Sequence, residues 1–224
     1  KVHEALGNEE AALADLKRAV ELAPAEPNVH EALGDFFQKR HEYEAALQEY
    51  SKFIQWAPSS AKAHASRGAA YNALGRYEKA LIDLRHGYGL DRSEPSAAIA
   101  LAWLLATAPP ELRNPQEALD IVRQHIEISN NGFAALGAAH YRLGDFEAAH
   151  AALIRAESAS QGADCAETRL FLAMTCWQLG QYHEARKWYD EAATWLDHEQ
   201  SRRNVHIQSV LSETTSLMAA PDKD

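Results

Sequence analysis

Small and aromatic side chains recur along this chain at a spacing of 34 residues. The segment 30–58 returns as 64–91, so that Gly34 corresponds to Gly68. The same pattern of apolar and polar positions also fits residues 7–24, 133–156 and 170–193. A repeat of this length is typical of architectures in which each unit is one supersecondary element stacked on its neighbours.

Each unit contains two apolar stretches with helical spacing, which predict two antiparallel helices, A and B, joined by a short turn. The predicted turns lie at His41-Glu42, Gly75-Arg76, Gly144-Asp145 and Gly180-Gln181. Glycine at such a turn permits a positive φ at the end of helix A. Small residues stand where the two helices should cross: Gly34, Gly68, Ala102, Gly137 and Ala173 on A, and Ala12, Ala46, Ala80, Ala118, Ala149 and Ala185 on B.

Large residues are expected to fill the gaps beside these crossings and to form the core. They are Leu33, Tyr43, Tyr50, Tyr71, Tyr77, Leu84, Leu136, Phe146, Leu153, Leu172, Tyr182 and Tyr189. The predicted fold is therefore all-α, a right-handed superhelical solenoid of antiparallel helix pairs. The predicted division is a partial unit 1–26, units at about 27–60, 61–94, 95–129, 130–164 and 165–200, a capping helix within 201–219, and a tail 220–224.

The fourth unit is irregular. The interval from Ala102 to Ala118 is about four residues longer than that from Gly34 to Ala46. The extra residues fall in a loop that Pro109-Pro110 should begin by stopping helix A. Asn114, followed by proline and then Glu117, has the signature of a helix N-terminus. A looser unit boundary is predicted at 158–164.

The first unit is incomplete, because Lys1 falls in the last turns of a helix A when the repeat frame is extended backward. The chain is therefore expected to be a fragment that begins within a unit. Helix B of that unit should lie at one end of the array, with the apolar side of Leu13, Leu16 and Val20 poorly covered.

The order of aromatic, Leu-Gly, aromatic, alanine, aromatic and proline positions closely resembles the tetratricopeptide repeat (TPR) family over roughly residues 1–197. The fourth and last units are similar to those of TPR arrays in large bacterial multidomain proteins. Departures from the family pattern are His30, His64 and Phe133 at the first tryptophan position, and Arg92 in place of the proline seen at Pro24 and Pro58.

Composition supports a helical chain: 43 alanines stand against 20 valines, isoleucines and threonines together. The net charge of −10 should repel nucleic acid and anionic lipid. We also expect no membrane insertion, because no apolar run reaches the roughly 18 residues that a spanning helix needs.

Motifs for chemistry are missing from the sequence. There is no HExxH, no histidine pair at i,i+4, no GxSxG and no phosphate-binding glycine loop. Cys165 and Cys176 are expected to be idle thiols in a reducing compartment. We therefore expect no catalytic residue, no metal site and no cofactor, and a cytoplasmic location.

A TPR solenoid implies a groove lined by helix A that binds a peptide or helix. Carrying the frame over gives these groove residues: Glu31, Asp35, Gln38, Lys39, Lys62, Asn72, Asn131, Tyr141, Arg142, Glu167, Met174, Trp177 and Gln178. Trp103 could face either the groove or the core. The alternative for the polar members is a merely solvated face.

The expected partner is a protein or peptide with some basic character, because the early groove carries Glu31 and Asp35. The carboxylate clamp by which some TPR proteins hold acidic chaperone tails is not met, since Ser66 follows these acids on the next helix A. Two roles fit: a non-catalytic interaction scaffold, or a regulatory segment of a larger enzyme such as a serine/threonine kinase. The loop Pro109 to Asn114 is an alternative working surface.

Overall fold

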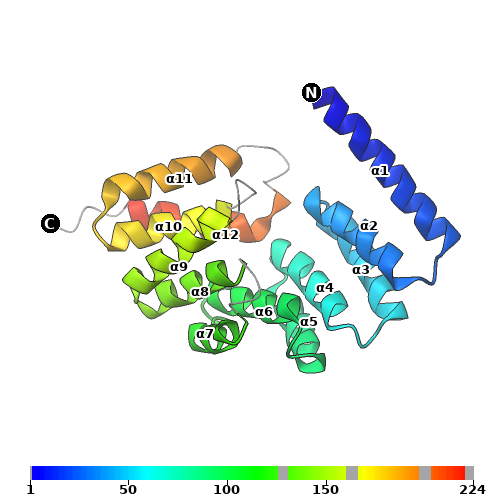
Figure 1. The fold of residues 1–224 in the computed structure, drawn as a ribbon. Coiled ribbons are helices and arrows are strands. Elements are labelled where there is room, and N and C mark those ends of the chain that lie inside the picture. Colours follow the sequence, from blue (N-terminus) through cyan, green and yellow to red (C-terminus); the bar gives the residue numbers. More distant parts are fainter. Residues whose placement is uncertain (1, 126–130, 160–165, 197–202, 220–224) are drawn as a thin grey trace.

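A computed structural model describes residues 2–125, 131–159, 166–196 and 203–219. Within these ranges the chain forms twelve helices and no strand (Figure 1). Their bounds are α1 Val2–Leu22, α2 Pro27–Lys39, α3 Tyr43–Trp56, α4 Ala61–Ala73, α5 Tyr77–Leu90, α6 Pro95–Thr107, α7 Pro115–Arg123, α8 Asn131–Leu143, α9 Phe146–Ala159, α10 Ala166–Gln178, α11 Tyr182–Leu196 and α12 Val205–Met218.

Helices α2 to α11 form five antiparallel pairs, in each of which the even-numbered helix is helix A and the odd-numbered helix is helix B. Each pair packs on the next to give the predicted all-α superhelix. The turns within four of the pairs contain the backbone conformation that the sequence predicted. His41, Gly75, Gly144 and Gly180 have φ values of 57°, 69°, 82° and 73°. These left-handed residues reverse the chain directly after a helix A.

The small residues lie at close helix crossings, as predicted. A Cβ added to Gly34 would stand 2.6 Å from the Tyr50 ring, and one added to Gly137 would stand 2.4 Å from the Leu153 side chain. Every predicted crossing residue is buried except Ala12. Ala12 is half-buried because α1 packs mainly against α2.

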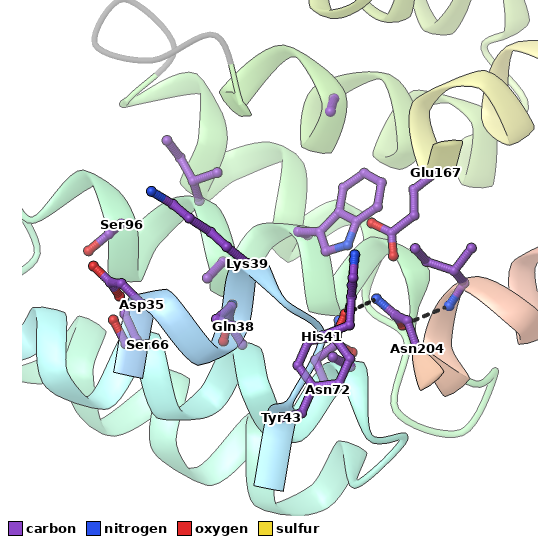
Figure 2. A pocket seen from close by; sticks show the side chains of 18 of the residues that line it. Asp35, Gln38, Lys39, His41, Tyr43, Ser66, Asn72, Ser96, Glu167 and Asn204 are labelled. Carbon is purple, nitrogen blue, oxygen red and sulfur yellow. Dashed lines mark hydrogen bonds between the residues drawn. The ribbon is translucent and has the colours of Figure 1, made fainter. Parts of the chain in front are cut away.

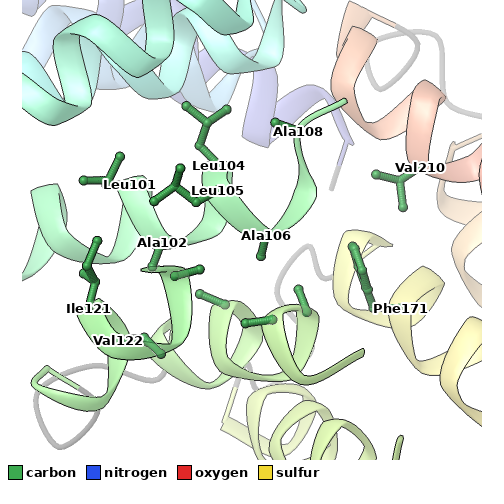
Figure 3. Close-up of a cluster of buried hydrophobic side chains, with 14 of the residues drawn as sticks. Leu101, Ala102, Leu104, Leu105, Ala106, Ala108, Ile121, Val122, Phe171 and Val210 are labelled. Atoms are coloured by element: carbon green, nitrogen blue, oxygen red, sulfur yellow. The ribbon is translucent and has the colours of Figure 1, made fainter. Parts of the chain in front are cut away.

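The centre of the core is α6, which is buried on nearly all sides (Figure 3). Helices α4, α5, α7 and α8 all pack against it. The long loop after α6 follows the prediction: Ala108 ends the helix, and the Asn114 side chain accepts a hydrogen bond from the Glu117 N–H at 3.2 Å to begin α7.

The first helix differs from the expectation. The frame placed Lys1 in the last turns of a separate helix A, but α1 runs without a break from Val2 through Gly7 to Leu22. Gly7 lies inside this helix and not at a turn. Leu13, Leu16 and Val20 are half-buried, in line with the expected poor cover.

The last helix, for which a cap on the array was predicted, makes contacts in two parts of the array. Helix α12 packs against α10 and additionally reaches α4, far back in the array. It therefore lies across the face formed by the A helices. Ile207 and Val210 of α12 join the main core cluster. The division into units stays a prediction, and the loose boundary at 158–164 lies largely outside the described residues.

Candidate partner-binding groove

The A helices line a partly open cavity of about 1010 Å³ between the two halves of the array (Figure 2). One wall consists of α2, α4 and α6. The opposite wall consists of the start of α10, Trp195 of α11, and Asn204 and Ile207 of the C-terminal segment. The volume is at the upper end of the range for ligand pockets, which suits a short protein segment.

Three carboxylates and one ammonium group line this cavity. Asp35 on α2, Glu94 before α6 and Glu167 on α10 supply the negative charges, and Lys39 supplies the positive one. Asp35 accepts a hydrogen bond from the Tyr50 hydroxyl at 2.8 Å. Glu94 caps α6, accepting from the Ser96 N–H at 3.1 Å. The charge of the lining therefore favours a cationic group.

Two amide oxygens in the lining are buried without a hydrogen-bond partner among the described residues. They are Oε1 of Gln38 on α2 and Oδ1 of Asn72 on α4. A buried acceptor without a donor costs free energy, so these two amides lower the stability of this wall.

Hydrogen bonds between distant segments close one side of the cavity. The Asn204 side chain donates to the Tyr43 hydroxyl at 3.2 Å, and that hydroxyl lies 2.7 Å from Nδ1 of His41. The His41 ring meets the Trp195 ring edge-on, with the centroids 6.0 Å apart. Asn204 also accepts from the Ile207 N–H at 3.0 Å, which begins α12.

Five of the predicted groove residues line the cavity: Asp35, Gln38, Lys39, Asn72 and Glu167. Glu31 and Lys62 form an ion pair with each other, and the hydrogen bond from Lys62 to Glu31 raises the pKa of Lys62. Trp103 meets both of the interpretations left open, because it lines the cavity and packs against the core. The side chain of Asn131 lies outside the described residues.

The later predicted residues are placed differently. Met174 is fully buried, because it faces the interior of the array and not the groove. Trp177 is only 9% exposed, in a cluster that Leu217 and Met218 of α12 help to cover. Neither side chain is therefore accessible as an anchor in this structure, and their role in binding stays a prediction.

The remaining members of the later groove, Tyr141, Arg142 and Gln178, lie in three different settings. The Arg142 side chain is bound to Glu213, and Tyr141 lies against Phe171, with their centroids 5.7 Å apart. Gln178 is exposed and is not part of the cavity lining.

Five residues that close the cavity were not predicted from the sequence: His41, Tyr43, Trp195, Asn204 and Ile207. The repeat frame assigns Tyr43 to the core and has no position equivalent to Asn204 or Ile207. Asn204 itself carried a signal for the start of the last helix, because asparagine is a strong N-cap residue and stands directly before a stretch with helical apolar spacing.

The described residues contain no group of three or more His, Cys, Asp and Glu side chains that could hold a metal ion. Cys176 is buried with a free thiol, and burial raises its pKa to about 11, so that it is a poor nucleophile at neutral pH. Cys165 lies outside the described residues.

Comparison with protein families identifies the repeat. Two family models, both described as tetratricopeptide repeat, match the chain, one at residues 32–95 and 134–198 and the other at residues 1–26. The first model alone matches more than half of the chain. The chain therefore belongs to the tetratricopeptide repeat family.

Solved structures share the fold at low sequence identity. The Cut9–Hcn1 hetero-tetramer of the APC/C has a TM-score of 0.69 at 16% identity, covering 93% of this chain and 40% of that chain. TTC0263, a thermophilic TPR protein of Thermus thermophilus, has a TM-score of 0.61 at 18% identity, covering 85% of this chain and 100% of that chain. YrrB, described as a TPR protein with an unusual peptide-binding site, has a TM-score of 0.50 at 17% identity, covering 84% of this chain and 95% of that chain. No curated protein matches the sequence.

These findings support a protein-interaction scaffold in general, which is the role typical of a TPR array. Proteins of this family are generally non-catalytic. Among the described residues no helix is long and apolar enough to cross a membrane.

Proposed function

We propose that this chain is a non-catalytic scaffold that holds a short segment of a partner protein in the cavity between α2, α4, α6 and α10. The single observation that carries the proposal is the cavity of about 1010 Å³, which the A helices line with convergent polar groups. YrrB, a structural relative, is described as a peptide-binding TPR protein, and a comparable role here fits the family.

The partner segment carries at least one lysine or arginine. Three carboxylates against one lysine give the lining a negative charge, and the whole chain carries −10. A guanidinium or ammonium group also supplies several N–H donors, which the carboxylates of the lining can accept. The same charges disfavour nucleic acid and acidic tails.

The cavity offers apolar surface beside its charges. Ile99 and Trp103 of α6 stand on one side and Trp195 of α11 on the other. An aliphatic or aromatic side chain next to the basic residue of the partner can pack between them, and such anchors supply most of the binding energy of an interface.

Fluorescein-labelled ten-residue peptides test the proposal. Each basic peptide is paired with one in which every lysine and arginine is replaced by glutamine, and binding is measured by fluorescence anisotropy at low and high salt. We expect basic peptides to bind at least tenfold more tightly at low salt, with the difference shrinking as salt screens the charges.

Two variants locate the binding. Asp35→Asn should weaken the basic peptide about tenfold, because a charge-assisted hydrogen bond is lost while the Tyr50 contact is kept. Asp190→Asn on α11 is the matched control, since this exposed aspartate does not line the cavity. Equal losses in both variants, or no preference for basic peptides, would refute the proposed site.

A further inference from the structure

Helix α12 is seated on the A helices as a bound helical ligand would be. The Glu213 carboxylate takes both terminal nitrogens of Arg142 on α8, with Nη2 donating to Oε2 at 2.7 Å. This leaves the Arg142 side chain only 7% exposed. Arg142 also donates to the backbone oxygen of Ala106 at 3.3 Å and lies over the Phe171 ring.

One face of α12 meets the array and the other faces solvent. Ile207, Val210 and Thr214 are buried, while Ser209, Ser212 and Ser216 are exposed. Leu217 continues the inner face against Trp177. Anchors spaced at i, i+3, i+7 and i+10 with a polar outer face are the pattern by which grooves recognise amphipathic helices.

The fit of α12 is incomplete at its polar groups. His206 is 1% exposed, and neither ring nitrogen has a hydrogen-bond partner among the described residues. The indole N–H of Trp188, which lies beside the same Trp177 cluster, also has no partner there. Buried polar groups without partners weaken an interface, since their hydration is lost without replacement.

Two arginines lie at this end of the groove. Arg113 of the long loop lies close enough to Arg142 and Glu213 for their charges to act on one another, and Glu111 of the same loop also acts on Arg113. Helix α12 itself supplies one carboxylate, Glu213, and that carboxylate is bound to Arg142. A helix with a second carboxylate placed toward Arg113 would therefore add a charge contact that α12 does not make.

We propose that α12 is an intramolecular occupant of the groove, and that a partner helix with carboxylates aimed at Arg142 and Arg113 takes its place. The proposal rests on the proposed function only in treating the A-helix face as a binding surface. Asn204 and Ile207 belong to the wall of the cavity. Release of α12 therefore opens the cavity as well, and the two ends of the groove select opposite charges.

Hydrogen exchange measured by mass spectrometry on the full chain tests whether α12 opens by itself. In the wild type, amides of α12 should exchange faster than those of α8 and α10. Glu213→Gln should raise exchange in α12 by a further factor of about ten, because a charge-assisted pair is lost, and should leave α8 unchanged. Glu147→Gln, at an exposed position on α9, is the matched control.

A labelled peptide of residues 203–219 tests the exchange of occupants. Glu213→Gln should bind this peptide about tenfold more tightly than the wild type, because its own α12 is loosened while Arg142 is kept. Arg142→Gln also loosens α12 but removes the receptor, and should bind the peptide weakly.

Three results would overturn the proposal: α12 exchanging only together with α8 and α10, equal peptide affinity in Glu213→Gln and Arg142→Gln, or a concentration-dependent dimer that swaps α12. The readouts are separate from those of the cavity, because this peptide carries the α12 face and not the basic segment. Loss of basic-peptide binding with retained α12 exchange would refute the proposed function alone.

Discussion

At the scale of single residues, two of the departures from the family pattern, His30 and His64, have a physical explanation. His30 lies 2.7 Å from a Glu49 oxygen and donates from Nε2 to the Pro24 carbonyl at 3.0 Å. His64 makes the corresponding contact with the Pro58 carbonyl at 3.2 Å, and its Nδ1 lies 3.5 Å from an Asp83 oxygen. A histidine can replace the usual tryptophan because a carboxylate 19 residues later faces it in both units. The two histidines could be read from the sequence. Their carboxylate partners could not, because these lie on the other helix of the pair and come close only where the two helices cross.

The close crossings lead to a prediction at the residue scale. Ala80 is fully buried between paired helices, so Ala80→Leu should overpack the pair and cost about 1–3 kcal/mol. Ala151→Leu on α9 changes an exposed alanine and should stay within about 0.5 kcal/mol of the parent. Urea unfolding measures both. Similar small effects in the two variants would contradict the crossing.

At the scale of elements, the sequence predicts the features that depend on one repeat unit and its nearest neighbours. The repeat spacing predicts the paired helices, their turns and the loop before α7, because each depends on residues within one unit. It does not predict α1 as one continuous helix or the position of α12, since neither has a repeated counterpart. Five groove residues of the cavity could be predicted, because they occupy fixed positions on helix A. Asn204 could not be predicted, because it lies outside the repeat.

The turns give a prediction at this scale. An added Cβ at Gly144 meets nothing within 4 Å, so Gly144→Ala should cost only the roughly 1–2 kcal/mol of a left-handed backbone. At Gly75 the same methyl would stand 2.8 Å from Val205 of α12, and Gly75→Ala should cost more. Thermal unfolding compares the two. A smaller loss at Gly75 would mean that Val205 does not pack on this turn.

At the scale of the whole molecule, α12 connects the two halves of the array and makes its stability sensitive to acid. Burial, and then the charge of Arg142, lower the pKa of His206 to about 4. The groups that face this ring are Arg142 on α8, Tyr77 on α5 and Glu167 on α10, whose Oε1 is 3.9 Å from Nε2. The folded chain therefore holds His206 neutral, while the unfolded chain protonates it below its ordinary pKa of about 6.5.

The sign of the pH dependence follows from this difference. Stability from neutral His206 is complete above pH 6.5 and is lost as the pH falls toward 4, at up to about 1.4 kcal/mol per unit. Between pH 7 and 5 the wild type should lose about 2 kcal/mol more than His206→Gln, measured by urea unfolding. His183→Gln, at an exposed position on α11, should behave as the wild type. A parallel loss in all three proteins would contradict the assignment.

The contact between Asn204 and Tyr43 spans 161 residues of sequence. In an open solenoid each unit touches only its neighbours, so the array stretches under tension as a spring and frays from its ends. Here the contact between Asn204 and Tyr43 connects the two halves of the array. Tension applied to the two ends of the chain therefore acts on this contact before the helix pairs between α3 and α10 can separate. The extension of this molecule should therefore begin with a single early rupture, after which the remaining units yield as an ordinary elastic array.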